Sequence, residues 1–238
     1  MHVCVIIPAL DEEGAIGTVV SGFLRALDGV ELAGHRLGCQ VLVADNGSTD
    51  ATAARAQEAG AVVISAPQRG YGSACLAALA ALPPDTELVM FADGDGADDP
   101  GDATALLLPI LLGEADLVIG SRVLGERLRL VEPGALTRPQ VFGNQLATTL
   151  LRWVFGMHFS DLGPCRAVSR AALERLAMDD RNFGWTVQMQ ARAARMRLRT
   201  REVPVHYRRR RSGHSKVSGD VRGSILAGGI ILRTLAIE

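Results

Sequence analysis

The sequence predicts an α/β fold: a doubly wound, mostly parallel sheet with helices on both of its faces. In residues 1–120, short β-rich apolar runs alternate with helical stretches, which is typical of parallel strands joined by crossover helices. Polar and glycine residues directly follow most of these apolar runs. In such sheets ligands bind beyond the carboxyl ends of the strands, so the residues after the runs are the first candidates for a functional site.

The first half of the chain supplies most of the expected sheet. We expect strands at residues 2–8, 40–44, 61–65, 87–92 and 116–120. We expect helices directly after Asp11 and at residues 49–59, 71–82 and 102–112. The polar segments that follow the strands should therefore meet at one edge of the sheet.

After Gly120 the alternation ends. The pattern predicts a loop at 122–138, helices at 140–155, 171–177 and 186–196, a strand at 199–207 and a terminal amphipathic helix from about Asp220. The sequence contains no internal repeat and no low-complexity linker, so residues 1–238 are expected to form one domain. The second half should then pack on the sheet as a lid over the site.

The charges of the two halves are opposite, although the net charge is only −1. Residues 1–120 contain 17 acidic and 4 basic residues, and residues 121–238 contain 9 acidic and 21 basic residues. An acidic half attracts cations, and a basic half attracts phosphates or an anionic membrane; two solvated faces would explain the counts equally well. Aromatic residues do not interleave with the arginines, so the basic half does not indicate nucleic-acid binding.

Cysteine usage and hydropathy favour a cytoplasmic protein. The four cysteines lie far apart and form no C-x-x-C pair, so the sequence suggests neither a disulfide framework nor a zinc site. The N-terminus begins with a strand-like run rather than a secretion signal. No segment reaches the roughly 18 apolar residues of a membrane-spanning helix, and the nearest, residues 224–237, is short and contains Arg233. Any membrane contact would therefore be peripheral, at the inner face of the plasma membrane.

The strongest local motif is the turn Asp93-Gly94-Asp95, which ends an apolar run. Glycines let the backbone bend there, so both carboxylates can face one cation. We expect Asp93 and Asp95 to bind Mg²⁺ or Mn²⁺ and to bridge it to a diphosphate. An EF-hand is excluded, because the sixth and twelfth loop positions are Asp98 and Thr104 rather than Gly and Glu. Capping of the next helix is the alternative role for the aspartates of this segment.

Three further segments follow predicted strands. Asp45 can accept hydrogen bonds from the imide edge of a uracil or guanine base, whereas Ser48 and its two neighbours are typical of a helix N-cap. Asp11 is expected to face the same crevice from the first strand. The stretch from Gly70 only half matches G-x-G-x-x-G and follows the third strand, so it indicates a close backbone approach near a nucleotide rather than a nicotinamide site.

The segment 208–216 contains four consecutive arginines and Lys216, the one lysine of the chain. Its composition is that of a flexible loop, which can close over phosphates when a substrate arrives. A solvated arginine run is the alternative interpretation.

Together these residues resemble the family-2 glycosyltransferases of GT-A fold, and within them the dolichyl-phosphate mannose synthase-like (polyprenyl-phosphate hexosyltransferase) group. The resemblance covers nearly the whole chain. Residues 8–13, 45–50 and 93–95 are similar to the family's P-x-x-N-E-E, D-D-G-S-x-D and D-x-D segments. Five further motifs of the group have counterparts here: Gly120-Ser121-Arg122 for G-[ST]-R, Arg138 with Asn144 for R-x-x-x-x-x-N, Ser160-Asp161-Leu162 for S-D-L, Gln188-Met189-Gln190 for Q-M-E, and residues 210–216 for R-x-x-G-x-S-K.

The resemblance implies an inverting transfer of a hexose from GDP-mannose or a UDP-hexose to a polyprenyl phosphate at the membrane surface. It implies a nucleotide- and metal-binding half (1–120) and an acceptor-binding half (121–238) with the basic loop 208–216. The implied donor-binding residues are Pro8, Leu10, Asp11, Glu12, Asp45, Asn46, Gly70, Asp93 and Gly94. The implied acceptor- and phosphate-binding residues are Arg122, Arg138, Asn144, Asp161, Gln188, Arg210 and Lys216. Catalytic roles would fall to Asp95, Arg122 and Lys216.

Three positions depart from the family pattern: Asn46 for the second Asp of D-D-G-S, Ala97 for a common Gln, and Gln190 for a common carboxylate. An inverting transfer to a hydroxyl requires a general base. A phosphate with a pKa near 6 is already anionic at neutral pH, so an anionic acceptor would tolerate Gln190.

Three alternatives remain open. The acceptor could be a soluble or glycolipid hydroxyl, with Asp161 or another carboxylate as the base. A nucleotidyltransferase shares this sheet, but its glycine-rich loop should follow the first strand, where residues 9–13 are acidic. A catalytically impaired nucleotide-binding protein would also explain the three departures.

For peripheral membrane contact, the candidates are the helix that contains Trp153 and Phe155 and the terminal helix, both flanked by arginines.

Overall fold

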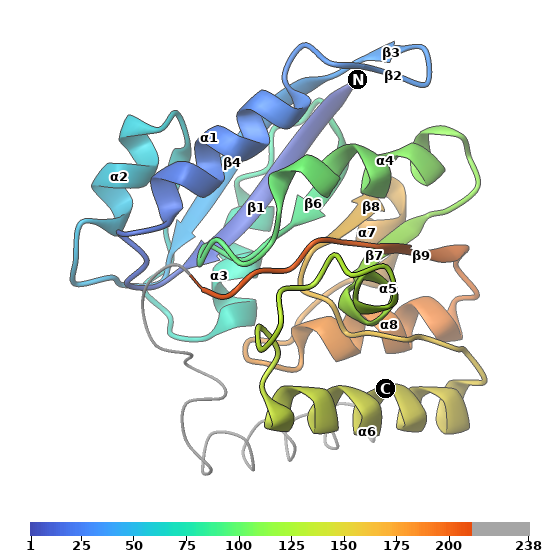
Figure 1. Ribbon diagram of the computed structural model, residues 1–238. Helices are drawn as coiled ribbons and strands as arrows, with labels where there is room; N and C mark the ends of the chain where they lie inside the picture. Colours follow the sequence, from blue (N-terminus) through green and yellow to red (C-terminus); the bar gives the residue numbers. More distant parts are fainter. Residues whose placement is uncertain (211–238) are drawn as a thin grey trace.

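A seven-stranded sheet forms the centre of the computed structural model, which describes residues 1–210 of the chain (Figure 1). The strands lie in the order β5-β4-β1-β6-β8-β7-β9. Their bounds are His2–Ala9 (β1), Gly38–Asp45 (β4), Val62–Ser65 (β5), Thr86–Phe91 (β6), Leu117–Ser121 (β7), Arg166–Ser169 (β8) and Thr200–Pro204 (β9). The five strands expected in the first half are all present, and the second half adds β8 and β9 to the same sheet.

The sheet is mostly parallel, as expected. β1 pairs in parallel with β4 and β6, β4 with β5, and β7 with β9. β8 is antiparallel to both of its neighbours, β6 and β7. It was not expected from the sequence, because its four residues begin with an arginine and form no apolar run. A hairpin of two-residue strands, β2 (Glu31–Leu32) and β3 (His35–Arg36), was also not expected.

Helices cover both faces of the sheet. Their bounds are Ile16–Leu27 (α1), Thr52–Glu58 (α2), Tyr71–Ala80 (α3), Ala103–Leu111 (α4), Arg122–Arg127 (α5), Arg138–Phe155 (α6), Arg170–Leu176 (α7) and Trp185–Arg195 (α8), with a 3-10 turn η1 at Pro100–Asp102. One buried apolar cluster joins α1 and α4 to one face, and a second joins α3, α7 and α8 to the other. α6 packs against α8 and forms the outermost layer, at the lower edge of Figure 1.

The sequence predicted a loop at residues 122–138. This prediction is wrong for its first part, which forms the helix α5. The hydroxyl of Ser121 accepts a hydrogen bond from the Leu124 amide and caps α5. Part of the predicted basic loop, residues 211–216, and the predicted terminal helix lie outside the described residues. Among the helices within residues 1–210, none is both long and apolar enough to cross a membrane.

The segment 66–70, which follows β5, is held by Asn46. The side-chain amide of Asn46 donates to the carbonyls of Ala66 (2.8 Å) and Gln68 (2.7 Å), and its oxygen accepts from the Gly70 amide (2.9 Å). An aspartate cannot donate to these two carbonyls. The departure from D-D-G-S therefore has a structural reason: position 46 requires a donor.

The start of α3 is held by a second close contact. The amides of Gly72 and Ser73 donate to the carbonyls of Asn182 and Arg181. A Cβ on Gly72 would lie 2.0 Å from the Asp180 carbonyl oxygen. At Gly72 the close backbone approach is to the chain's own backbone at 180–182; a close approach of this stretch to a nucleotide stays a prediction.

We predict that Gly72→Ala lowers the free energy of unfolding by about 2–3 kcal/mol, because the backbone at Asp180 must move to admit a methyl group. Gly143→Ala is the matched control, since a Cβ there meets nothing within 4 Å; it should stabilise α6 by roughly 0.5–1 kcal/mol. Urea denaturation measures both. Equal free energies of unfolding for the two variants would contradict the close packing of Gly72 against the backbone at Asp180.

We predict that Asn46→Asp costs on the order of 2–4 kcal/mol at neutral pH, because a buried carboxylate would face two carbonyl oxygens. Asn182→Asp, which makes the same charge change at an exposed position, should cost far less. Thermal or urea unfolding of the two variants compares them, and an Asn46→Asp protein as stable as the parent would refute the donor requirement.

Candidate active site

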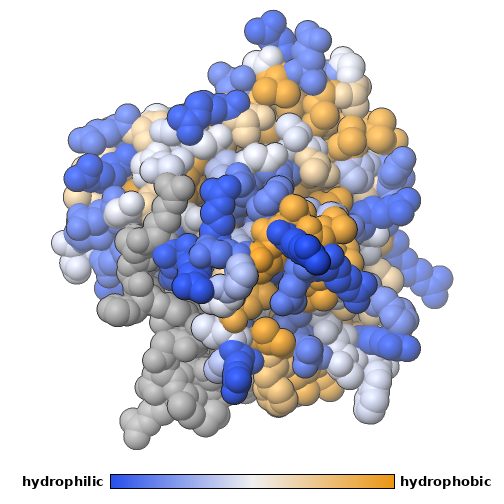
Figure 2. All heavy atoms as spheres, in the orientation of Figure 1, coloured by the Kyte–Doolittle hydropathy of each residue, from blue (hydrophilic) through white to orange (hydrophobic). Residues whose placement is uncertain are grey.

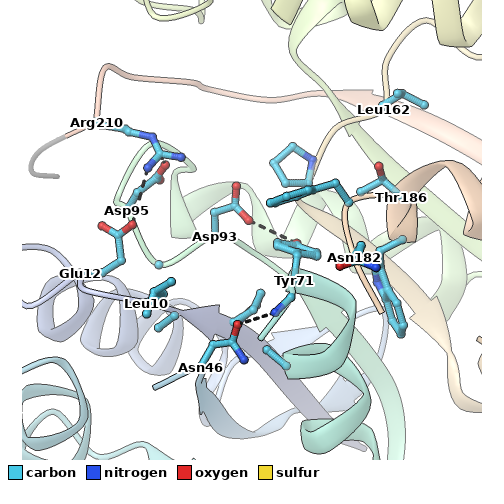
Figure 3. Close-up of a pocket in the computed structure, with 18 of the residues that line it drawn as sticks. Leu10, Glu12, Asn46, Tyr71, Asp93, Asp95, Leu162, Asn182, Thr186 and Arg210 are labelled. Carbon is cyan, nitrogen blue, oxygen red and sulfur yellow. Dashed lines mark hydrogen bonds and ion pairs between the residues drawn. The ribbon is translucent and has the colours of Figure 1, made fainter. Parts of the chain in front are cut away.

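A cavity of about 550 Å³ lies at the carboxyl ends of the parallel strands. Its lining includes residues from the ends of β1, β4, β6 and β7, as expected from the strand pattern. Ten of the residues predicted from the sequence line it: Pro8, Leu10, Glu12, Asn46, Gly70, Asp93, Gly94, Asp95, Arg122 and Arg210. Figure 3 shows Glu12, Asp93 and Asp95 together near Arg210, with Asn182 and Thr186 across the cavity from them.

An acidic cluster lies at the end of β6. Asp95 and Asp98 are almost completely buried. Asp98 accepts a hydrogen bond from the Asp93 amide, and Asp93 accepts one from the Tyr71 hydroxyl (3.2 Å). Burial and the neighbouring charge of Asp95 raise the pKa of Asp93 to about 6, and burial with Asp93 raises the pKa of Asp98 well above its usual range. The cluster therefore needs positive charge to keep its carboxylates ionised.

Arg210 supplies one such charge. Its Nε lies 2.8 Å from Oδ2 of Asp95, and its Nη1 lies 3.6 Å from Oε1 of Glu12. The contact with Asp95 is an ion pair without hydrogen-bond alignment, since Oδ2 accepts no hydrogen bond among the described residues. The other oxygen, Oδ1, accepts from the Ala97 amide (2.9 Å). One oxygen of Asp95 is therefore fixed by the backbone, and the other faces the guanidinium of Arg210.

Within residues 1–210, no group of three or more His, Cys, Asp or Glu side chains is arranged as a complete metal site. Mg²⁺ is usually bound by only one or two carboxylates together with water and substrate phosphates. Asp93 and Asp95, both lining the cavity, fit that pattern. They would bind a divalent cation only together with a ligand that supplies further oxygens.

Arg122 lies in the same cavity and is held by Asp161. Its amide and Nε donate to Oδ2 of Asp161, and its Nη2 donates to Oδ1, each at 2.8 Å. Its guanidinium also stacks over the ring of Tyr207, 5.2 Å from the centroid. Although burial opposes the charged form, Asp161 raises the pKa of Arg122. Arg122 is therefore a fixed cation, with its remaining N–H groups available to an anion.

Several predicted residues do not line the cavity. Asp45 and Asp11 accept hydrogen bonds from the amides of Ser48 and Thr49, so both carboxylates hold the turn before α2. Gln188 accepts from the amides of Asp179 and Asp180. The remaining predicted residues outside the lining are Arg138, Asn144 and Asp161. Lys216 lies outside the described residues.

Aromatic residues of the cavity were missed by the sequence reasoning. The chain has two tyrosines and two tryptophans, and Tyr71, Tyr207 and Trp185 all line the cavity. In a chain with 4% aromatic residues, their scarcity was the signal that could have identified them. Arg166 was also missed: it is fully buried and donates to the carbonyls of residues 162, 163 and 186.

The comparisons with known proteins agree with this geometry. The model of glycosyl transferase family 2 matches residues 4–177. An uncharacterized glycosyltransferase of Mycobacterium tuberculosis is 37% identical over 228 residues, which cover 94% of each chain. A polyprenol monophosphomannose synthase of Mycolicibacterium smegmatis is 28% identical over 234 residues, covering 90% of this chain and 80% of that one.

A solved structure has the same fold. The crystal structure of glucosyl-3-phosphoglycerate synthase from Mycobacterium tuberculosis in complex with Mn²⁺, UDP-glucose and phosphoglyceric acid matches with a TM-score of 0.74 at 25% sequence identity. The match covers 100% of this chain and 80% of that one. The chain therefore belongs to glycosyl transferase family 2.

Proposed function

We propose that this glycosyltransferase transfers a hexose from GDP-mannose or a UDP-hexose, with inversion, to a polyprenyl phosphate. One observation carries the proposal: Asp93 and Asp95 face the same cavity as Arg122, whose guanidinium is fixed on one edge and available on the other. The carboxylates of Asp93 and Asp95 suit a cation that is bound to a diphosphate, and the guanidinium of Arg122 suits a second phosphate.

The donor is proposed to bind along the carboxyl ends of β1, β4 and β6. Main chain and side chains of Pro8, Leu10 and Asn46 line this part of the cavity. Mg²⁺ or Mn²⁺, held by Asp93 and Asp95, would neutralise charge on the departing nucleoside diphosphate. Arg210, already paired with Asp95 and Glu12, lies on the side where that charge develops.

The transfer forms one bond and breaks one bond. An oxygen of the acceptor phosphate attacks the anomeric carbon, the bond from this carbon to the diphosphate breaks, and its electron pair leaves with the nucleoside diphosphate. A phosphate monoester is already anionic at neutral pH, so no group has to remove a proton. Arg122 would orient the attacking phosphate and offset its charge.

A smaller phosphorylated acceptor is the second candidate. The matched synthase structure contains phosphoglyceric acid, which carries a phosphate but would be glycosylated on a hydroxyl and so would require a base. Asp161 is poorly suited to that role, because it is 1% exposed and both of its oxygens accept from Arg122. Among described residues, the carboxylates of the cavity are Glu12, Asp93 and Asp95, all on the proposed cation side.

The outer face of α6 is proposed to contact the membrane. Phe142, Leu146 and Trp153 lie at i, i+4 and i+11 and therefore on one side of the helix. Phe142 is 68% exposed and Trp153 is 80% exposed. Arg138 and Arg152 accompany them, and Figure 2 shows apolar and hydrophilic atoms side by side over α6 at the lower edge of the molecule. Gln140 of the same helix, on the side opposite to Phe142, lines the cavity, so α6 would separate the cavity from the lipid.

The proposed function is tested by measuring release of nucleoside diphosphate from GDP-mannose and UDP-hexoses with Mn²⁺. We expect release to require polyprenyl phosphate and Mn²⁺, and we expect Asp95→Asn to reduce it by about 100-fold or more, since it removes a cation ligand. Asp99→Asn is the control, because Asp99 pairs with Arg208 and does not line the cavity.

Two results would overturn this function. Release that requires 3-phosphoglycerate and ignores polyprenyl phosphate would favour the second candidate. Nucleotide binding without transfer to either acceptor would favour a catalytically impaired nucleotide-binding protein.

The membrane contact is tested by flotation with vesicles that contain phosphatidylglycerol. We expect salt-sensitive binding that falls by about tenfold or more in Phe142→Ser/Trp153→Ser, because two apolar side chains no longer enter the lipid interface. Leu112→Ser, which removes an exposed apolar side chain next to α4, should bind as the parent does. Binding that is unaffected by the α6 substitutions would exclude this face.

A further inference from the structure

We infer that Glu202, on β9, is a positioning residue for Arg122 and acts through the loop Ser160-Asp161-Leu162. Glu202 does not line the cavity, and no motif of the sequence pointed to it. The inference rests on the proposed function only in that Arg122 is taken to bind an anionic group of a substrate.

Side chains hold every main-chain polar group of the loop. Glu202 accepts from the amides of Ser160 (2.9 Å) and Asp161 (3.1 Å). Asn144, on α6, donates to the Ser160 carbonyl (3.1 Å) and accepts from the Leu162 amide (2.8 Å). Gln190, on α8, donates to the Asp161 carbonyl (3.0 Å), and Arg166, on β8, donates to the Leu162 carbonyl (2.9 Å).

This degree of fixation is unusual for a loop, because turn and loop backbone groups are generally satisfied by water or by neighbouring backbone. Four side chains from four separate elements converge on three residues. The central side chain of the loop, Asp161, makes both of its carboxylate contacts with Arg122. The loop therefore fixes the position and the orientation of one cavity arginine.

Glu202 reaches Arg122 by two routes. The first passes through the Asp161 amide and the Asp161 carboxylate. The second passes through hydroxyls: Ser160 Oγ donates to Glu202 (2.9 Å), and Ser121 Oγ lies 2.7 Å from Ser160 Oγ. Ser121 caps α5, whose first residue is Arg122. Both the side chain of Arg122 and the helix on which it lies thus depend on one carboxylate.

The contacts of Glu202 require an acceptor. Two amides and a hydroxyl all donate toward it, whereas a glutamine would place an amide NH₂ close to the donating Ser160 amide. The guanidinium of Arg122 has five N–H groups. Its two side-chain hydrogen bonds to Asp161 fix the plane of the guanidinium and therefore the direction in which the other N–H groups point. A shift of the loop would therefore misalign the anion-binding edge of Arg122.

Positioning and simple electrostatics predict opposite results for Glu202→Gln. If Glu202 acted only through its charge, its removal would strengthen anion binding near Arg122. If it positions Arg122, the same substitution weakens anion binding. The sign of the change therefore separates the two roles.

The experiment titrates the protein with UDP and GDP, each with Mn²⁺, and with inorganic phosphate. Arg122→Ala identifies the probe whose affinity depends on Arg122. We expect Glu202→Gln to weaken binding of that probe by about three- to tenfold, and Glu202→Ala to weaken it further. Glu114→Gln, which removes an exposed carboxylate that pairs loosely with Arg201, should leave the affinity unchanged.

A double-mutant cycle completes the test. In the Arg122→Ala background, Glu202→Gln should cause no further loss, because the group that it positions is absent. Melting temperatures are recorded for all variants, so that Glu202→Gln remains informative if Glu202→Ala unfolds. Tighter or unchanged binding in Glu202→Gln, or additive losses in the cycle, would overturn the inference and leave the proposed function intact. If no probe depends on Arg122, the phosphate-binding role of Arg122 itself fails, and the inference fails with it.

Discussion

The burial of like charges at the end of β6 is the constraint on which the rest of the site depends. Asp93, Asp95 and Asp98 lie within six residues of chain; Asp95 and Asp98 are buried and Asp93 is half-buried. Burial and the neighbouring carboxylates raise the pKa of Asp93 and of Asp98. Carboxylates in this position remain ionised only if cations lie nearby. The fold supplies arginines on two sides, Arg210 and Arg122, and Arg210 pairs directly with Asp95.

The course of the second half of the chain follows from this constraint. After β9, residues 205–210 cross the carboxyl edge of the sheet and pair with the acidic segment that follows β6. The Arg208 amide donates to the Ala97 carbonyl, and Tyr207 forms a bridge with Asp98. The basic half thus contacts the acidic half through backbone pairing as well as through ion pairs. Some of the opposite charges of the two halves therefore meet at the site.

The sequence predicted the sheet and the acidic edge, because both depend on local patterns. Apolar runs identified the parallel strands, and Asp93 and Asp95 directly follow one of them. It could not predict that Asp11 and Asp45 hold a turn, since a carboxylate at a strand end can accept from a ligand or from backbone amides with equal chemistry. Glu202 was missed for another reason: its partners are 41 and 42 residues away, so no local pattern connects them.

Two of the three departures from the family pattern, Asn46 and Gln190, have physical explanations in this structure. Asn46 donates two hydrogen bonds that an aspartate could not make. Gln190 donates to the Asp161 carbonyl, which an ionised carboxylate could not do. Ala97 is buried, but its contacts with Asp95 and Arg208 are made by its backbone, so nothing in the structure explains this substitution. The donors at positions 46 and 190 fix the cavity wall and the loop beneath Arg122, and they stabilise the fold whether or not the site is catalytic. At these two positions a neutral amide stands where the family has a carboxylate, because the neighbouring backbone presents acceptors.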